Sequence, residues 1–515
     1  MKALNQSQKE FVETSGNLIL IAGPGTGKTH ALIFKLQALL EKGVPSSDIL
    51  ALTFTHKAAL EMNSRLEVLS KPLITTFHGL CYLNLNEAQK KNLITDELQK
   101  ELLVKKVLKK TNLKLNIKEA SLHISLYKIG QVNNINAFKL ADSYNQILKQ
   151  KNLIDYDDLL LDFKPSKKYK YVFVDEFQDT NKLQYQIIKK LVLKNSQVQV
   201  VGDPYQNIYT FRGATPNLFD VFKKDFKAKR LELTATYRSV KRITKFTNSF
   251  YKDRNLETQI NSFGKIELVQ TPSKYSEANY IIEKIKSAIG GLDLNSASEV
   301  QSGGELDFAS FAVIFRSHWL GKIVEKKLMQ NNIPFQKAGA SSIWASKAGE
   351  MFIREAKQNI KNKVDPVSFL NTLSLGEKEN LSLKPHLYRF ETMEQFLEEY
   401  ETLKQNDFID QQASAVSLLT MHASKGLEFD TVFIIGLDDA NMPMTIKKDK
   451  MNKNRLEEEK RLLYVGCSRA KRKLILLYTS SVSRFFSELD LDLVNTIRDE
   501  KAYKRKLKKA QIKLF

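Results

Sequence analysis

The sequence has few of the residues that build disulfide frameworks, zinc sites, flexible chains or membrane spans. Its 515 residues include two cysteines, Cys81 and Cys467, which lie far apart without Cys/Cys or Cys/His metal-ligand spacing, so neither a disulfide framework nor a zinc site is expected. Only 21 glycines and 11 prolines are present, which excludes a collagen-like or largely disordered chain. No apolar run approaches the roughly 20 residues that cross a bilayer, and residues 1–16 are too polar for a signal peptide. A reducing, cytoplasmic location without membrane attachment is therefore predicted.

The charge balance is strongly basic. The chain carries 80 Lys+Arg against 58 Asp+Glu, a formal net charge of +22, and such an excess is typical of proteins with a polyanionic partner. Because nothing in the sequence favours a membrane, nucleic acid is the predicted partner. Hydrophobic residues make up 42% of the chain, enough for the three or four packing units that this length suggests.

The pattern along the chain predicts an α/β protein with two parallel sheets. Short β-rich apolar runs are mostly followed by a polar turn and then a helical pattern, as in doubly wound folds. These runs are residues 17–22, 49–54, 169–174, 197–201, 230–233, 312–315 and 431–436. A helical period between residues 85 and 161 predicts an insertion in the first sheet, and a second insertion is expected at about residues 334–413. The Gly/Ser-rich stretch 290–304 predicts a loop, and residues 500–509 form a basic tail.

The sharpest motif is a glycine-rich loop between a strand and a helix. It reads Ala-Gly-Pro-Gly-Thr-Gly-Lys-Thr over residues 22–29. Glycines let backbone N–H groups turn toward a phosphate chain, Lys28 suits the β/γ-phosphates, and the Thr29 hydroxyl suits Mg²⁺. The loop therefore predicts a nucleotide site built from Gly23, Gly25, Thr26, Gly27, Lys28 and Thr29.

A pair of carboxylates follows a second apolar strand. Asp175 and Glu176 come directly after Val-Phe-Val, where Asp175 can hold Mg²⁺ and Glu176 can polarise an attacking water. Two acids after a strand can also be a simple helix cap, but together with the upstream loop they predict an NTPase.

Motif II and seven other short motifs together give a family resemblance. Residues 175–181, Asp-Glu-Phe-Gln-Asp-Thr-Asn, resemble motif II of the UvrD/Rep/PcrA branch of superfamily 1 DNA helicases. The other helicase motifs follow in the family's order, at residues 4–8 (Q motif), 53–59 (Ia), 76–79, 201–214 (III), 237–239 (IV), 419–429 (V) and 457–470 (VI). The motifs touch both ends of the chain, and each alone would be a weak match.

The resemblance implies roles in ATP hydrolysis. It identifies Gln8 with the adenine-reading glutamine, Tyr237 with the residue that stacks on adenine, and Glu428 with the ribose contact. Gln206 is similar to the γ-phosphate sensor of motif III. Arg238 and Arg469 resemble the two arginine fingers that neutralise the γ-phosphoryl charge. ATP and Mg²⁺ are thus the implied cofactors.

The resemblance also implies contacts with single-stranded DNA. A translocase needs aromatic platforms among basic and hydroxyl groups, because unstacked bases bind to aromatic faces. Phe54, Tyr209 and Phe211 occupy positions where the family stacks bases, although Phe211 replaces an expected tryptophan and Phe54 could instead belong to the core. The remaining implied DNA contacts are Thr76, His78, Arg212 and His422.

The resemblance implies two RecA-like P-loop motor domains, 1A (residues 1–85 and 161–236) and 2A (237–333 and 414–490). A helical insertion 1B (86–160), a reduced second insertion 2B (334–413) and a basic tail (491–515) complete the expected organisation. It also implies an ATP-dependent 3′–5′ translocase and helicase in DNA repair or replication, acting on single-stranded DNA and single-strand/duplex junctions. Two alternatives remain: a superfamily 1 helicase of opposite polarity or acting on RNA, and a nucleotide-gated DNA-binding or displacement factor with little unwinding.

The last five residues suggest a separate hypothesis. Gln511, Leu514 and Phe515 resemble the peptide by which bacterial replication and repair proteins bind the sliding clamp. A free C-terminus behind a basic stretch suits a peptide that orders on binding. Alternatively, these residues end an amphipathic helix that packs on the chain's own motor domain.

Overall fold

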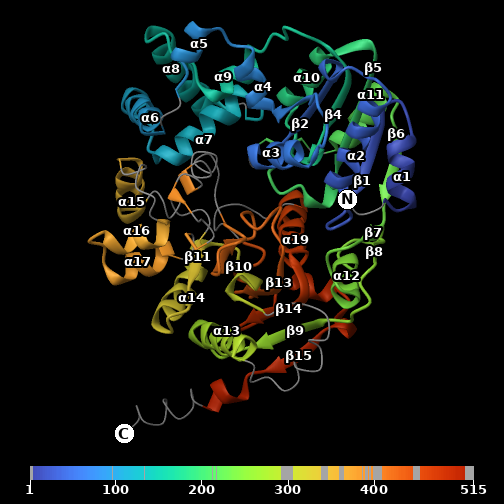
Figure 1. Cartoon of the computed structure of the whole chain (residues 1–515). Coiled ribbons are helices and arrows are strands. Elements are labelled where there is room, and N and C mark those ends of the chain that lie inside the picture. The colour runs from blue at the N-terminus through green and yellow to red at the C-terminus, as the bar shows by residue number, and fades with distance from the viewer. Residues whose placement is uncertain are drawn as a thin grey trace. The chain divides into compact units, whose positions relative to one another are not determined.

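The computed structural model describes residues 4–94, 97–132, 134–210, 213–215, 217–290, 306–337, 346–358, 365–384, 387–388, 392–393, 396–397, 409–444 and 453–504. The chain divides into two compact units, Met1–Thr234 and Ala235–Phe515, each of which is shown in Figure 1. Among the helices that the structure describes, none is long and apolar enough to cross a membrane.

The first unit is built on a parallel sheet with strand order β3-β2-β4-β5-β1-β6. Each strand pairs in parallel with its neighbours, and β1 lies between β5 and β6. The strands are β1 (Leu18–Ala22), β2 (Ile49–Thr53), β3 (Leu73–Thr76), β4 (Tyr169–Val174), β5 (Val192–Gly202) and β6 (Lys229–Leu233). Because all strands run the same way, the loops that follow β1, β2, β3, β4 and β5 meet at one edge, where ligands bind in such sheets.

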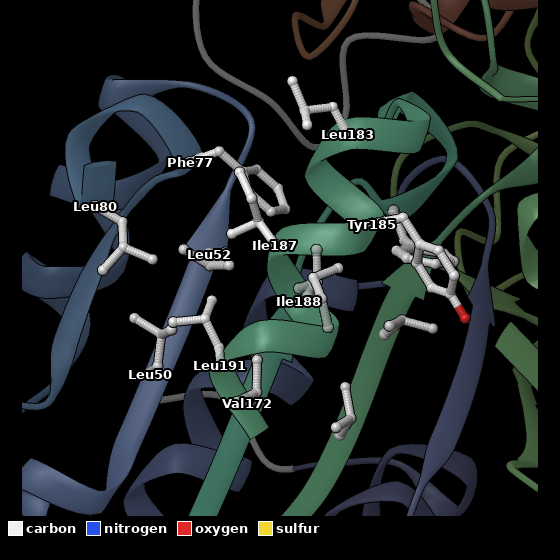
Figure 2. Packing of buried hydrophobic residues seen from close by; sticks show 14 of the residues in the cluster. Leu50, Leu52, Phe77, Leu80, Val172, Leu183, Tyr185, Ile187, Ile188 and Leu191 are labelled. Carbon is white, nitrogen blue, oxygen red and sulfur yellow. The ribbon is translucent and has the colours of Figure 1, made fainter. Parts of the chain in front are cut away.

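Helices cover both faces of this sheet, as the near-continuous apolar strands require. Ile19, Ile21 and Val172 pack on one side with helices α4, α10 and α11, while Leu18, Leu20 and Phe173 pack on the other with α1, α2 and α3. Figure 2 shows the first of these clusters, in which side chains of α10 lie against β2 and β4. The helices are α1 (Gln6–Glu13), α2 (Lys28–Glu41), α3 (His56–Arg65), α4 (Phe77–Leu83), α10 (Lys182–Leu191) and α11 (Leu218–Phe226).

A helical segment with its own core interrupts the first unit between β3 and β4. Val104, Ala120 and Tyr144 are buried in a cluster formed mainly by three helices that pack on one another. The helices of this segment are α5 (Glu87–Lys91), α6 (Glu97–Thr111), α7 (Ile117–Lys128), α8 (Ile135–Gln150) and α9 (Tyr156–Leu161). The change of period in the sequence therefore predicted helices correctly here.

The second unit contains another parallel sheet, with order β11-β12-β10-β13-β14-β9-β15. Its strands are β9 (Lys265–Gln270), β10 (Phe311–Phe315), β11 (Phe335–Lys337), β12 (Val416–Thr420), β13 (Phe429–Ile435), β14 (Ala470–Tyr478) and β15 (Asn495–Arg498). Helices α13 (Lys274–Ile289) and α14 (His318–Gln330) pack on one face. Helices α12 (Lys241–Asn248) and α19 (Lys453–Cys467) also contact the sheet, and a short pair, β7 (Ala235–Thr236) and β8 (Glu257–Thr258), precedes it.

Two details of the second unit differ from the expected organisation. Strand β11 pairs with β12 in the main sheet, so the sheet extends past residue 334, where the second insertion was expected to begin. Strand β15 pairs with β9, so residues 495–498 belong to the sheet rather than to a basic tail. Both are short edge strands, whose weak apolar pattern does not distinguish them from loops.

The second insertion contains helices that enclose a small core. Phe352, Leu370 and Phe396 are fully or almost fully buried there, and the Phe352 and Phe396 rings meet edge to face with centroids 5.5 Å apart. The helices are α15 (Lys347–Gln358), α16 (Pro366–Thr372) and α17 (Glu377–Leu383). The shortened segment is therefore a packed helical element in the part that the structure describes.

Candidate nucleotide and nucleic-acid site

The phosphate loop joins the end of β1 to the start of α2. Gly25 and Gly27 have φ values of 71° and 75°, a left-handed conformation that residues with a side chain rarely adopt. Lys28 begins α2, so the first N–H groups of this helix face the loop and favour an anion. The segment therefore has the strand–loop–helix geometry that the predicted phosphate site needs.

Gln8 lies against this loop. Asn5 caps α1 in a reciprocal box with Gln8, and the Gln8 Nε2 donates to the Thr26 carbonyl at 3.0 Å. A Cβ atom on Gly27 would lie only 2.8 Å from Gln8 Nε2 and would displace this amide, and the positive φ of Gly27 also favours glycine. The buried Lys35 amine of α2 donates to the Phe11, Val12 and Thr14 carbonyls and so anchors the end of α1. The structure thus brings Gln8 and the phosphate loop together.

The two carboxylates of motif II follow β4 at the same edge of the sheet. Glu176 adopts φ 50° and ψ 40°, a conformation that costs free energy for a residue other than glycine and often marks functional sites. The Glu176 N–H donates to Asp175 Oδ1 at 2.9 Å, and the Glu176 carboxylate pairs with the Lys28 amine. Lys28 therefore joins the phosphate loop to motif II.

The charges of this cluster shift one another. Burial and the neighbouring Glu176 charge raise the pKa of Asp175 to about 6, against the opposing effect of Lys28. Burial lowers the pKa of Lys28, but Glu176 and Asp175 outweigh it and raise this pKa above its usual value. The site thus holds one permanent cation between two acids, an arrangement suited to receiving phosphate and a metal together.

The residues predicted to hold Mg²⁺ lie side by side. The Thr29 side chain is hydrogen-bonded to the Asp175 carboxylate. In the described part of the chain, no group of three or more His, Cys, Asp or Glu side chains forms a metal cage. Mg²⁺ is usually bound by one or two protein oxygens together with substrate phosphates and waters, so Thr29 and Asp175 fit it.

Motif III begins where β5 ends. Gln206 is 4% exposed, and its Nε2 donates to the fully buried Asp203 carboxylate at 2.9 Å. The Asp203 N–H in turn donates to Gln178 Oε1 at 2.9 Å. Gln178 and Asp203 were not among the predicted site residues, although their place inside motifs II and III was the signal that could have identified them.

Two of the predicted base-stacking residues lie together. The Phe54 and Tyr209 rings stack with centroids 5.4 Å apart and an interplanar angle of 19°. Phe54 is only half-buried, so it is not a core residue. Phe211 and Arg212 lie outside the described residues, and so does the clamp-peptide segment with Gln511, Leu514 and Phe515.

The other predicted DNA contacts of the first unit have structural partners. Thr76 caps α4, its hydroxyl accepting from the Gly79 N–H at 3.0 Å. His78 lies edge to face with Tyr156, with ring centroids 6.0 Å apart. Burial lowers the pKa of His78, which keeps this ring neutral at physiological pH. Thr76 is the last residue of β3, and His78 lies just beyond it.

In the second unit the predicted nucleotide residues cluster where β13 and β14 begin. Arg238 Nε donates to Glu428 Oε2 at 2.7 Å and Lys471 also pairs with Glu428. Burial raises the pKa of Glu428, but these two cations outweigh it and lower the pKa below its usual value. Tyr237, next in the chain to Arg238, is 48% exposed.

Arg469 is held differently from a surface arginine. It is 1% exposed, and its guanidinium donates to the Val465 and Leu427 carbonyls and to the Ser468 hydroxyl at 2.9, 3.2 and 2.7 Å. The carbonyl of Ser468 also accepts from Arg238 at 3.4 Å, so the two predicted fingers share a neighbour. His422 lies just past the carboxyl end of β12, away from the start of β13 and β14.

Comparison with known proteins agrees with this geometry. A model of the UvrD/REP helicase N-terminal domain matches residues 4–227, and a model of the UvrD-like helicase C-terminal domain matches residues 231–348 and 354–481. The chain is 28% identical to "ATP-dependent DNA helicase Rep" of Buchnera aphidicola, over 95% of this chain and 97% of that protein. It is 29% identical to "Probable DNA helicase II homolog" of Mycoplasma capricolum, over 92% and 85% respectively.

A third relative is "ATP-dependent DNA helicase PcrA" of Bacillus subtilis, 26% identical over 97% of this chain and 87% of the relative. The alignment with the Buchnera protein runs over 642 positions, more than the 515 residues of this chain, so that relative carries segments absent here. With both halves matched in order and the phosphate loop, motif II and motif III at one sheet edge, the chain belongs to the UvrD/Rep/PcrA-like helicases.

Proposed function

We propose that the chain is an ATP-dependent DNA helicase that translocates 3′ to 5′ along single-stranded DNA and works in DNA repair or replication. The observation that supports this most directly is the partly buried cluster of Lys28, Thr29, Asp175 and Glu176 at the carboxyl edge of the first sheet. The three relatives of the chain described above are named as DNA helicases, and two of these names include ATP dependence. The polarity rests on the family resemblance alone.

In this proposal each charged group has one task. Lys28 and the N–H groups of the loop bind the β- and γ-phosphates, while Thr29 and Asp175 hold Mg²⁺, which neutralises charge on the phosphates when bound. Glu176 orients and deprotonates the attacking water. Arg238 and Arg469 stabilise the charge that develops on the γ-phosphoryl oxygens. Because Arg469 is 1% exposed within its own unit, its guanidinium must become more accessible to contact a phosphate.

The test is ATP hydrolysis with and without single-stranded DNA, in the wild-type chain and in Glu176→Gln. Losing a general base reduces turnover by about 10² to 10⁴-fold while nucleotide binding persists. Glu232→Gln is the matched control, because Glu232 lies on β6 of the same unit with a 51% exposed side chain. Near-normal turnover in Glu176→Gln would contradict the assignment of the base.

A strand-displacement assay tests the proposed unwinding, its polarity and the kind of nucleic acid that is unwound. Duplexes with a 3′ tail, a 5′ tail or an RNA strand distinguish the proposed helicase from one of opposite polarity or one that acts on RNA. Unwinding of the 3′-tailed DNA alone is the expected result.

A second candidate function is displacement of bound proteins with little unwinding. It is favoured by the short second insertion, in which helices α15–α17 enclose a small core, and by the longer aligned length of the relatives. DNA-stimulated hydrolysis together with translocation, but without strand separation, would support it.

We also propose that Gln511, Leu514 and Phe515 bind the bacterial sliding clamp. Clamp binding of the whole chain is to be compared with that of a chain lacking residues 511–515. Loss of binding with unchanged ATP hydrolysis is the expected result, whereas equal binding by both would contradict the peptide.

A further inference from the structure

Gln178 connects the proposed catalytic base to motif III. It lies in the short helix η2 (Phe177–Asp179) and is 2% exposed. Its Nε2 donates to Glu176 Oε2 at 2.5 Å, and its Oε1 accepts from the Asp203 N–H at 2.9 Å. A carboxylate can only accept and a backbone N–H can only donate, so the amide has one possible orientation.

The space around Gln178 is fixed by Gly202, the last residue of β5. A Cβ atom on Gly202 would lie 2.2 Å from Gln178 Oε1 and 3.1 Å from the Phe177 nitrogen. Gly202 does not have a positive φ, so its backbone conformation does not require glycine. The glycine is needed because it lets the Gln178 side chain approach the backbone of β5 closely. The amide oxygen of Gln178 therefore sits directly against the end of β5, where motif III starts.

Motif III is attached to motif II at a second place. The Thr215 N–H donates to the Thr180 carbonyl at 3.1 Å, and Asn181 forms an antiparallel bridge with Ala214. Asp203 near the start of motif III and residues 214–215 at its end are thus both bonded to the segment that carries Glu176. Tyr209, which stacks on Phe54, lies between these attachments.

Both oxygens of the Glu176 carboxylate are therefore occupied, one by Lys28 and the other by Gln178. Lys28 belongs to the phosphate loop and is drawn toward any phosphate that binds there. Gln178 lies on the other side of the carboxylate, and its amide is bonded to Asp203. Motif III can consequently affect Glu176 through the Gln178 amide.

We propose that Gln178 is a positioning residue that orients the Glu176 carboxylate and makes this orientation depend on the conformation of motif III. A base that binds at Phe54 and Tyr209 shifts the motif III segment, the Asp203 N–H moves with it, and the Gln178 amide transmits the movement to Glu176. DNA-stimulated hydrolysis then requires Gln178, a residue to which the proposed function gives no contact with ATP or DNA. This inference rests on the proposed function.

The first experiment uses Gln178→Met, which keeps the length of the side chain and removes both hydrogen bonds. A hydrogen bond to a charged group corresponds to about 10- to 100-fold in rate, so kcat with single-stranded DNA should fall by that factor. The KM for ATP and the affinity for a fluorescent ATP analogue should change by less than about threefold, because the phosphate-binding groups remain. The ratio of DNA-stimulated to basal hydrolysis should approach 1.

Gln199→Met is the matched control. Gln199 is a fully buried glutamine of β5, and its Nε2 donates to the Gly16 carbonyl, away from motif II. This variant loses a buried hydrogen bond of the same unit, so it measures the effect of a packing change alone. Its stimulation ratio should stay at the wild-type value.

Gln178→Glu provides a second variant with a different signature. A glutamate keeps the acceptor for the Asp203 N–H but, when ionised, cannot donate to Glu176. Its activity relative to wild type should rise as the pH falls, because a protonated glutamate regains the donor. A packing role alone would not produce this pH profile.

The outcomes separate this inference from the function on which it rests. If the wild-type chain shows no DNA-stimulated hydrolysis, the proposed function fails. If the wild type is stimulated and Gln178→Met keeps its kcat and stimulation ratio within about twofold, Gln178 is not a positioning residue. If Gln178→Met fails to fold, a pH-independent activity ratio in Gln178→Glu overturns the inference instead.

Discussion

Replacement of Lys128 tests how much its buried ion pairs stabilise the helical segment of the first unit. The Lys128 side chain is 2% exposed and its amine binds Asp155 Oδ1 at 2.9 Å and Asp158 Oδ1 at 2.7 Å. It also lies 5.4 Å from the centroid of the Tyr144 ring. Lys128→Met keeps most of the aliphatic volume but leaves two acids without their cation. Removing one partner of a buried pair costs about 3–5 kcal/mol.

This loss can be converted into a melting temperature. For a unit of this size, Met1–Thr234, each kcal/mol corresponds to about 2–4 °C, so a decrease of about 6–20 °C is expected. Differential scanning calorimetry of the full chain measures the decrease, and hydrogen exchange in α7 and α8 assigns the transition to the first unit. Lys118→Met is the control, because Lys118 is an exposed lysine of the same helix and should change stability by less than about 0.5 kcal/mol.

A compensating variant examines the electrostatic reasoning. Asp155 is the N-cap of α9, and asparagine caps a helix as well as aspartate does. Adding Asp155→Asn and Asp158→Asn to Lys128→Met removes the unpaired charges and should recover part of the lost stability. A decrease below about 2 °C in Lys128→Met, or no recovery in the triple variant, would refute the reasoning.

Three further changes have defined outcomes. Burial and the Asp438 charge raise the pKa of Glu277 to about 8, so the folded state keeps a proton that the unfolded state loses above its lower pKa. Stability should therefore fall from about pH 5 to pH 8, by up to about 1.4 kcal/mol per pH unit, and denaturant titrations of Glu277→Gln should lose this dependence. Tyr209→Ala should weaken oligodeoxythymidine binding by about 1–3 kcal/mol in fluorescence anisotropy, and an unchanged affinity would mean that Tyr209 only packs on Phe54. Gly27→Ala should weaken ATP-analogue binding in calorimetry, because its Cβ would lie 2.8 Å from Gln8 and its φ is positive; normal affinity would show that the loop tolerates a side chain.

Local signals in the sequence identified seven strands of the two sheets and the nucleotide loop. The runs 18–22 and 49–53, for example, are almost entirely apolar, and such segments identify strands buried on both faces. The phosphate loop is contiguous in sequence, since its glycines, Lys28 and Thr29 act within eight residues. By contrast, strands β3, β9, β11, β12, β14 and β15 were not among the predicted strands, and the assignment of the edge strands β11 and β15 depends on which neighbour pairs with them.

The sequence by itself determined the prediction of an NTPase site and the order of the motifs, because each motif consists of contiguous residues. Only the tertiary structure decided which groups share one site. Lys28 and Glu176 are 148 positions apart, and they meet because parallel strands bring the loops after β1 and β4 to one edge. The hydrogen bond from Asp203 to Gln178, the one from Arg469 to the Leu427 carbonyl and the stacking of Phe54 on Tyr209 are likewise long-range contacts. Hydrogen bonds and packing between distant segments depend on where the backbone places them, which no local pattern of residues specifies.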